Sequence, residues 1–124
     1  MGVADLVDFA GFLADPYEAY FKSDCLLMCS EHEGMGRVTA EAMSACVPAI
    51  GRNSGGTPEV ITHGKTGFLY DTQEELVECM ARMVGNPELG RQLGLEGWRV
   101  AREKFAVEDY AGNVYNVIQS VSRQ

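Results

Sequence analysis

Apolar residues occur along the chain in short continuous runs, and polar or amphipathic stretches separate these runs. Four runs have strand length, at 7–13, 25–29, 48–51 and 67–70. Helical patterns lie between and after them, at 16–22, 36–45, 71–85, 88–104 and from 107 onward. Strands that alternate with helices predict a parallel sheet with right-handed crossovers, and therefore an α/β fold in which helices cover the sheet.

Two finer expectations concern which side chains are buried. On the helix that follows Tyr70, five apolar residues share one face and are expected to pack into the core: Leu76, Val77, Met80, Met83 and Val84. Cys25 and Cys29 would face the same side of one strand as small buried residues. We therefore expect reduced, structural cysteines and no disulfide or metal cluster.

Length and charge limit the classes of function. A chain of 124 residues is the size of one compact domain, and residues 1–124 are predicted to form a single, partial domain. The formal net charge of −8 argues against nucleic acid as the main partner, because phosphate binding needs a clustered basic surface. No apolar run reaches membrane-spanning length, and the N-terminus lacks the basic start of a signal peptide. These features predict a cytoplasmic location.

The stretch "SEHEGMGRVTAEAM", residues 30–43, carries the main chemical signal. It joins the strand at 25–29 to the next helix, so the loop lies at the carboxyl end of a parallel strand, where ligands bind in α/β sheets. The amides of Gly36, Arg37 and Val38 would start the helix without intrahelical partners. Together with the helix dipole they suit a phosphate or diphosphate.

Two carboxylates bracket this helix start. Glu41 lies about five residues into the helix, roughly 7 to 8 Å from its first amides, which is about the reach from a diphosphate to its ribose. Carboxylates accept hydrogen bonds from vicinal hydroxyls, so Glu41 suits a ribose diol and Glu33 suits a hydroxylated group on the other side of the phosphate. Sugar, diphosphate and ribose in that order describe a nucleotide sugar.

At these residues the chain resembles the retaining glycosyltransferases of family 4, which have the GT-B fold. The resemblance rests on a serine followed by two glutamates separated by seven residues, and on a second block, "GRNSGGTPEVITHGKTGFLY". It covers essentially the whole chain, and implies the C-terminal half of a Rossmann-like donor domain with trailing helices. A phosphosugar epimerase of similar fold is less favoured, because the second block matches the transferases throughout.

The resemblance implies a role for each site residue. Glu33 would bind the hydroxyls of the transferred hexosyl group as the catalytic-site carboxylate, and Glu41 would bind the ribose of the donor. Backbone around Gly34, Met35, Gly36, Arg37 and Val38 would contact sugar and diphosphate. The family transfers the sugar with retention and without a metal, so no cofactor is expected. The "EHE" at 31–33 is not read as a metal site, because adjacent loop residues seldom converge on one ion.

Departures from the family pattern set further expectations. Met35 replaces an aromatic residue, and Cys46 replaces a glycine that lets the helix end pack closely. The chain is also expected to lack the acceptor-binding N-terminal domain and the Arg and Lys that reach the diphosphate. Alone it is predicted to be nearly inactive toward its glycan, lipid or small-molecule acceptor. The alternatives are a fragment, a split-gene product, or a non-catalytic remnant that binds the missing part or itself; peripheral membrane association through the missing part stays open.

Overall fold

The computed structural model describes residues 2–106, 112, 115–116 and 118–120. Its sheet contains three parallel strands in the order β1–β2–β3, with β1 at Leu26–Met28, β2 at Ala49–Arg52 and β3 at Gly67–Tyr70. Leu26 pairs with Ala49, and Ala49 in turn pairs with Gly67, so the three strands start level with one another. The predicted parallel α/β fold is confirmed.

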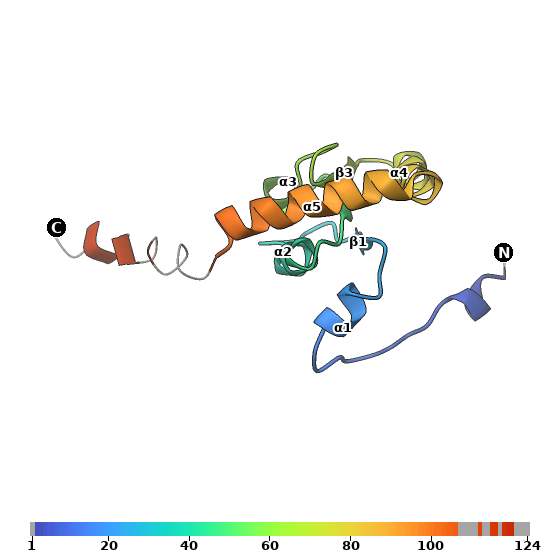
Figure 1. Ribbon diagram of the computed structural model, residues 1–124, viewed down its shortest axis with the longest axis horizontal. Coiled ribbons are helices and arrows are strands. Elements are labelled where there is room, and N and C mark those ends of the chain that lie inside the picture. Colours follow the sequence, from blue (N-terminus) through green and yellow to red (C-terminus); the bar gives the residue numbers. More distant parts are fainter. Residues whose placement is uncertain (1, 107–111, 113–114, 117, 121–124) are drawn as a thin grey trace.

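Helices connect and cover these strands (Figure 1). The first elements are a short 3-10 helix, η1, at Ala4–Leu6, and α1 at Tyr17–Tyr20. The helix α2, at Arg37–Ser44, joins β1 to β2, and the short α3, at Thr57–Val60, follows β2. The last two are α4 at Gln73–Gly85 and α5 at Pro87–Lys104. In the described part of the chain, no helix is long and apolar enough to span a bilayer.

Local sequence explains where the longest helices begin. Thr72 caps α4 by accepting a hydrogen bond from the Glu75 amide, while the Glu75 carboxylate accepts from the Thr72 amide. The side chain of Asn86 accepts from the Leu89 amide and caps α5, whose first residue is a proline. The stop signal at 85–87 therefore both ends α4 and starts α5.

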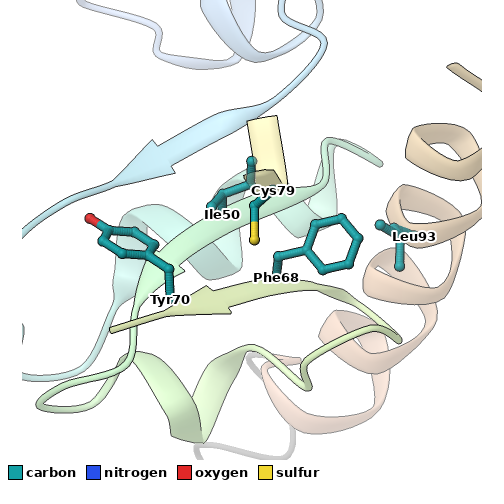
Figure 2. Packing of buried hydrophobic residues seen from close by; sticks show 5 residues of the cluster. All are labelled: Ile50, Phe68, Tyr70, Cys79 and Leu93. Atoms are coloured by element: carbon teal, nitrogen blue, oxygen red, sulfur yellow. The ribbon is translucent and has the colours of Figure 1, made fainter. Parts of the chain in front are cut away.

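The main apolar core lies between the sheet and the last two helices. Figure 2 shows Ile50, Phe68 and Tyr70 from the strands packed with Cys79 of α4 and Leu93 of α5. A second cluster, on α2, α3 and α5, includes Met43, Val60 and Ala101. The sheet is thus held from both sides, as expected for buried parallel strands.

Small residues let α5 approach the C-terminal end of α2 closely. A Cβ atom added to Gly94 would overlap the carbonyl oxygen of Cys46, and one added to Gly97 would press on the side chain of Met43. Cys46 itself has φ of 61°, and is the one non-glycine residue with positive φ in the described backbone. The sequence expectation that this position belongs to a glycine has a physical basis, because left-handed backbone is costly for other residues.

The predicted strand at 7–13 is wrong. These residues form no strand, and the N-terminal segment runs away from the body of the molecule (Figure 1). Phe9 and Phe12 are 92% and 94% exposed, and Gly11 has φ of 71°, which interrupts extended backbone. An apolar run forms a strand only when a neighbouring strand accepts its hydrogen bonds, and in the described structure none does here.

The predicted core stripe of α4 is only partly correct. Leu76 and Met83 pack against the core, whereas Val77 and Met80 are exposed and Val84 is 82% exposed. The helix is rotated so that Cys79 is its buried residue.

The cysteine prediction is also partly wrong, since Cys25 is half-buried and Cys29 is exposed. All four cysteines are free. The helix predicted from residue 107 falls mostly outside the described residues.

Candidate functional site

The loops that leave the carboxyl ends of the strands lie at one edge of the sheet. Residues 29–36 follow β1, residues 53–56 follow β2, and residues 71–72 follow β3. Because the strands are parallel and level, these loops are neighbours. The predicted site residues therefore lie where an α/β sheet binds ligands.

The start of α2 is built around Gly36. This residue is the N-cap, has φ of 65°, and lies against the side chain of Val60. The amide of Gly36 donates a hydrogen bond of 3.3 Å to Oε1 of Glu33. At this helix end the N-cap residue provides no capping side chain, and the first turn contains no acidic residue. The amides of Arg37 and Val38, which follow Gly36, therefore start the helix without a side-chain cap.

A pair of glycines supports the loop that carries Glu33. The amide of Gly56 donates a 2.7 Å hydrogen bond to the carbonyl oxygen of Glu33. An added Cβ atom on Gly55 would lie 2.5 Å from that same oxygen, and one on Gly56 would overlap the carbonyl of Gly34. The second glycine-rich block thus packs backbone to backbone on the first, which explains why both glycines are needed.

Glu41 lies on α2, one turn beyond Arg37, and both of its carboxylate oxygens are contacted. Oε1 lies 3.5 Å from Nε of Arg37. Oε2 accepts a 3.2 Å hydrogen bond from the hydroxyl of Tyr20, the last residue of α1. Burial, and then the Glu41 carboxylate, raise the pKa of Tyr20 to about 12, so this hydroxyl is a proton donor at neutral pH.

A second ion pair ties the first loop to β2. Nη1 of Arg52, at the carboxyl end of β2, lies 2.9 Å from Oε1 of Glu31. Both side chains are partly exposed, so this pair contributes little to stability. It does place a cation at the same edge of the sheet as Glu33.

The structure places the predicted site residues around one helix start, as expected from their spacing. Glu33 and Glu41 are half-buried, whereas Gly34, Met35, Arg37 and Val38 are exposed and Gly36 is buried. No group of three or more His, Cys, Asp or Glu side chains in the described part of the chain could hold a metal ion.

Sequence reasoning missed Tyr20, which is 8% exposed. Its position in a short amphipathic helix indicates burial, but no local pattern indicates that its hydroxyl reaches Glu41, 21 residues further along the chain. The contact of Gly55 and Gly56 with the Glu33 loop was also not predicted, because it joins two segments that are distant in the sequence.

Comparison with known sequences identifies relatives of this chain. The family model described as "Glycosyl transferases group 1" matches residues 1–98. N-acetyl-alpha-D-glucosaminyl L-malate synthase of Bacillus anthracis is 32% identical over 123 residues, which cover 98% of this chain and 32% of that protein. An alpha-1,3/1,6-mannosyltransferase of Mus musculus is 34% identical over 95 residues, covering 76% of this chain and 23% of the relative.

Solved structures share the fold. HepE of Anabaena in complex with UDP superimposes with a TM-score of 0.91 at 25% identity, over 96% of this chain and 34% of HepE. A sucrose-phosphate synthase of Thermosynechococcus elongatus gives a TM-score of 0.90 at 25% identity, over 98% of this chain and 31% of the synthase. These neighbours are GT-B glycosyltransferases, and the matched region is a part of their C-terminal domain.

The chain spans about a third of the length of these relatives or less. Within that span the family match covers the loop, the helix start, both glutamates and the glycine pair. The chain therefore belongs to the group 1 glycosyltransferases, and its fold is a fragment of the C-terminal domain of a GT-B enzyme.

Proposed function

We propose that this chain holds the nucleotide-sugar donor of a retaining family 4 glycosyltransferase that transfers a hexosyl group. Glu41 binds the ribose diol, Glu33 binds the hydroxyls of the transferred sugar, and the backbone from Gly34 to Val38 binds sugar and diphosphate. The observation that carries the proposal is the arrangement around α2, where two carboxylates flank a helix start that has no side-chain cap.

The local chemistry supports this assignment. The positive end of the helix dipole stabilises a diphosphate leaving group without a metal. Glu33 already accepts a hydrogen bond from the Gly36 amide, so its carboxylate lies next to the proposed diphosphate site. HepE, a structural neighbour, was crystallised with UDP and glucose and with UDP-glucose, which makes UDP-glucose a sensible first donor to test.

We propose that the acceptor is bound by a further domain, and that residues 1–124 form one partial donor domain in the cytoplasm. Because the matched relatives are about three times as long, we expect residues 1–124 alone to bind donor but to transfer sugar very slowly, since a partial domain does not enclose the donor and exclude water.

Donor binding can be tested with conservative variants. UDP, UDP-glucose, GDP-sugars and ADP-sugars are titrated into the chain, and the melting temperature and NMR spectra are recorded. One of these donors should raise the melting temperature, because a ligand that binds only the folded state stabilises it. Glu33→Gln and Glu41→Gln should each weaken binding about tenfold, the usual cost of a hydrogen bond to a charged group.

Glu59→Gln is the matched control, since Glu59 is an exposed carboxylate on the neighbouring α3. It should leave the affinity unchanged. If saturating concentrations of every donor leave spectra and melting temperature unchanged, the proposal that this chain holds a donor is wrong. Retention is tested on a complete glycosyltransferase that contains this region, from the anomeric configuration of its product.

A second candidate function, an interaction module, is favoured by an apolar groove. The groove runs along β1, α4 and α5, and its walls include Leu27, Met80 and Val84. In the described structure β1 pairs only with β2, so its outer edge is open. Because the relatives are about three times as long, the occupant we propose is the rest of the glycosyltransferase.

The oligomeric state, measured by sedimentation, and the binding of a hydrophobic dye together test whether the groove is open and what covers it. A monomer that binds a hydrophobic dye supports an open groove that receives the rest of the enzyme. A dimer that does not bind the dye indicates that two copies cover each other's grooves and contradicts the proposed occupant. A monomer that binds no dye contradicts the interaction module altogether.

A further inference from the structure

Tyr20 joins the N-terminal part of the chain to the candidate site. Its ring is buried in a cluster with Ala42 and Val47 and makes an edge-to-face contact with Tyr17, with ring centroids 5.6 Å apart. Such packing holds the ring in one orientation. The hydroxyl at the end of this fixed ring therefore has a fixed position.

That hydroxyl points at the carboxylate of Glu41. It donates to Oε2 at 3.2 Å, and the carbonyl oxygen of Val38 lies 3.5 Å away as a weaker second acceptor. A tyrosine hydroxyl has one proton, so the shorter contact is the main hydrogen bond.

Arg37, the other group that contacts Glu41, is much less constrained. Its Nε lies 3.5 Å from Oε1, but its side chain is 84% exposed. Ion pairs of this kind, four residues apart on a helix surface, are weak and are screened by salt. Of the two contacts, the one with Tyr20 is therefore the better able to define the orientation of the Glu41 carboxylate.

We propose that Tyr20 is a positioning residue for the donor nucleotide, holding Glu41 in the orientation that accepts hydrogen bonds from the ribose hydroxyls. This inference rests on the proposed function of Glu41. A carboxylate has about four acceptor sites, and Tyr20 uses one of them, so enough remain for two ribose hydroxyls. Holding the side chain before the ligand arrives lowers the entropy lost on binding.

The test measures recognition of the ribose rather than overall affinity. Dissociation constants of UDP and 2′-deoxy-UDP are compared for the wild-type chain and Tyr20→Phe, which removes only the hydroxyl. We expect Tyr20→Phe to weaken UDP binding roughly three- to tenfold, the range for one hydrogen bond, and to weaken 2′-deoxy-UDP binding less. The preference for UDP over the deoxynucleotide should therefore shrink.

Two further variants serve as controls. Tyr17→Phe removes a hydroxyl from the adjacent ring of the same helix, and should leave the preference unchanged. In a Glu41→Gln background, Tyr20→Phe should have little further effect on the preference, because two residues that act through one contact are not additive.

The outcomes separate this inference from the proposed function. If Glu41→Gln reduces the preference for UDP and Tyr20→Phe does not, Glu41 binds ribose without help and the positioning role is wrong. If Tyr20→Phe weakens both nucleotides equally, or no more than Tyr17→Phe does, the role is also wrong. If Glu41→Gln leaves UDP binding unchanged, the proposed function of Glu41 fails and the inference fails with it.

A spectroscopic measurement tests the contact without any ligand. Tyrosine ionisation is followed by ultraviolet absorbance as the pH is raised. The pKa of Tyr20, raised to about 12 by burial and by Glu41, should fall in Glu41→Gln. An unchanged titration curve in that variant would show that the hydrogen bond does not form, and would overturn the proposal even if Tyr20→Phe folds poorly.

Discussion

A residue with left-handed backbone lies at each end of α2, but the two residues have different roles. At its start, Gly36 has φ of 65° and precedes amides that have no side-chain cap. Just beyond its end, Cys46 has φ of 61°, and its carbonyl oxygen lies directly under Gly94 of α5. Gly36 begins the helix beside the loops at the edge of the sheet. Cys46 changes the direction of the chain after the helix, so that the following residues enter the core.

The difference follows from the direction of α2 in the fold. A helix that joins two parallel strands starts at the carboxyl edge of the sheet and ends at the opposite edge. The first end carries residues proposed to bind ligand, and the second end carries packing contacts. Changes at the second end should therefore alter stability, and changes at the first should alter binding.

The largest effect is expected where α5 meets the end of α2. In Gly94→Ala the new methyl group would overlap the Cys46 carbonyl and lie 3.3 Å from Cδ of Pro48, so the helix must move. The free energy of unfolding should fall by about 3 kcal/mol, the upper range for overpacking. Urea denaturation measures the fall.

Gly90→Ala, one turn earlier on α5, is the control for this prediction. Its added methyl group would make only an ordinary 3.7 Å contact with Met83. Alanine also has the higher helix propensity, so stability should hold or rise slightly. Equal losses in the two variants would mean that the close approach at Gly94 is unimportant.

At the other end of α2, Gly56→Ala should affect binding more than stability. The added methyl group would overlap the Gly34 carbonyl and displace the loop that carries Glu33. Displacements of about 1 Å can cost up to a hundredfold in a site, so we expect donor affinity to fall by tenfold or more. Calorimetric titration, with Glu59→Gln as control, provides the measurement. Unchanged affinity would place this loop outside the donor site.

Cys46→Gly places a glycine at the left-handed position at each end of α2, and should stabilise the protein. Glycine adopts φ of 61° without strain, whereas a side chain there costs about 1–2 kcal/mol. Because glycine also loses more entropy on folding, the net gain should be about 1 kcal/mol in urea denaturation. Cys46→Ala keeps a Cβ atom and should show no gain. If the two variants are equally stable, the left-handed backbone is not strained.

The smallest effect is a loss of stability at alkaline pH. The pKa of Tyr20 is raised in the folded state, mainly by burial and then by Glu41, so folding favours the neutral hydroxyl. Its contribution is complete below pH 10, the ordinary pKa, and is lost as the pH rises toward 12.

Tyr20→Phe should therefore reduce the alkaline loss of stability by about a few tenths of a kcal/mol at pH 10. The difference between urea denaturation at pH 8 and at pH 10 gives this value. Burial also raises the pKa of Tyr70 to about 12 and of Cys25 to about 11, so part of the alkaline loss should persist. An identical pH dependence in wild type and variant would contradict the Tyr20 assignment.

Much of the fold was predictable because its signals are local. The strand at 67–70 was predicted with its observed bounds. The predicted helix at 36–45 differs from α2 by one residue at each end, and the one at 88–104 differs from α5 by one residue at its start. The prediction of a strand at 7–13 was wrong because an apolar run does not reveal whether another strand will pair with it. The short helix α3 was not predicted, because its four residues are too few to show a helical pattern.

In the candidate site, too, features that depend on adjacent residues were predictable and contacts between distant segments were not. The spacing of Glu33 and Glu41 and the start of α2 at Gly36 could be worked out from adjacent residues. The support from Gly55 and Gly56, and the hydrogen bond from Tyr20, could not, because each joins segments about 20 residues apart along the chain.

By itself, the sequence determined the order of the three strands and of the helices α1, α2, α4 and α5, and the place of two carboxylates on either side of a helix start. These depend on periodicity and on turn residues, which act over a few positions. Only the tertiary structure decided that Cys79 rather than Val84 is buried on α4, and that Tyr20 contacts Glu41. Such choices depend on how helices rotate and pack against the sheet, and that is settled by contacts between distant parts of the chain.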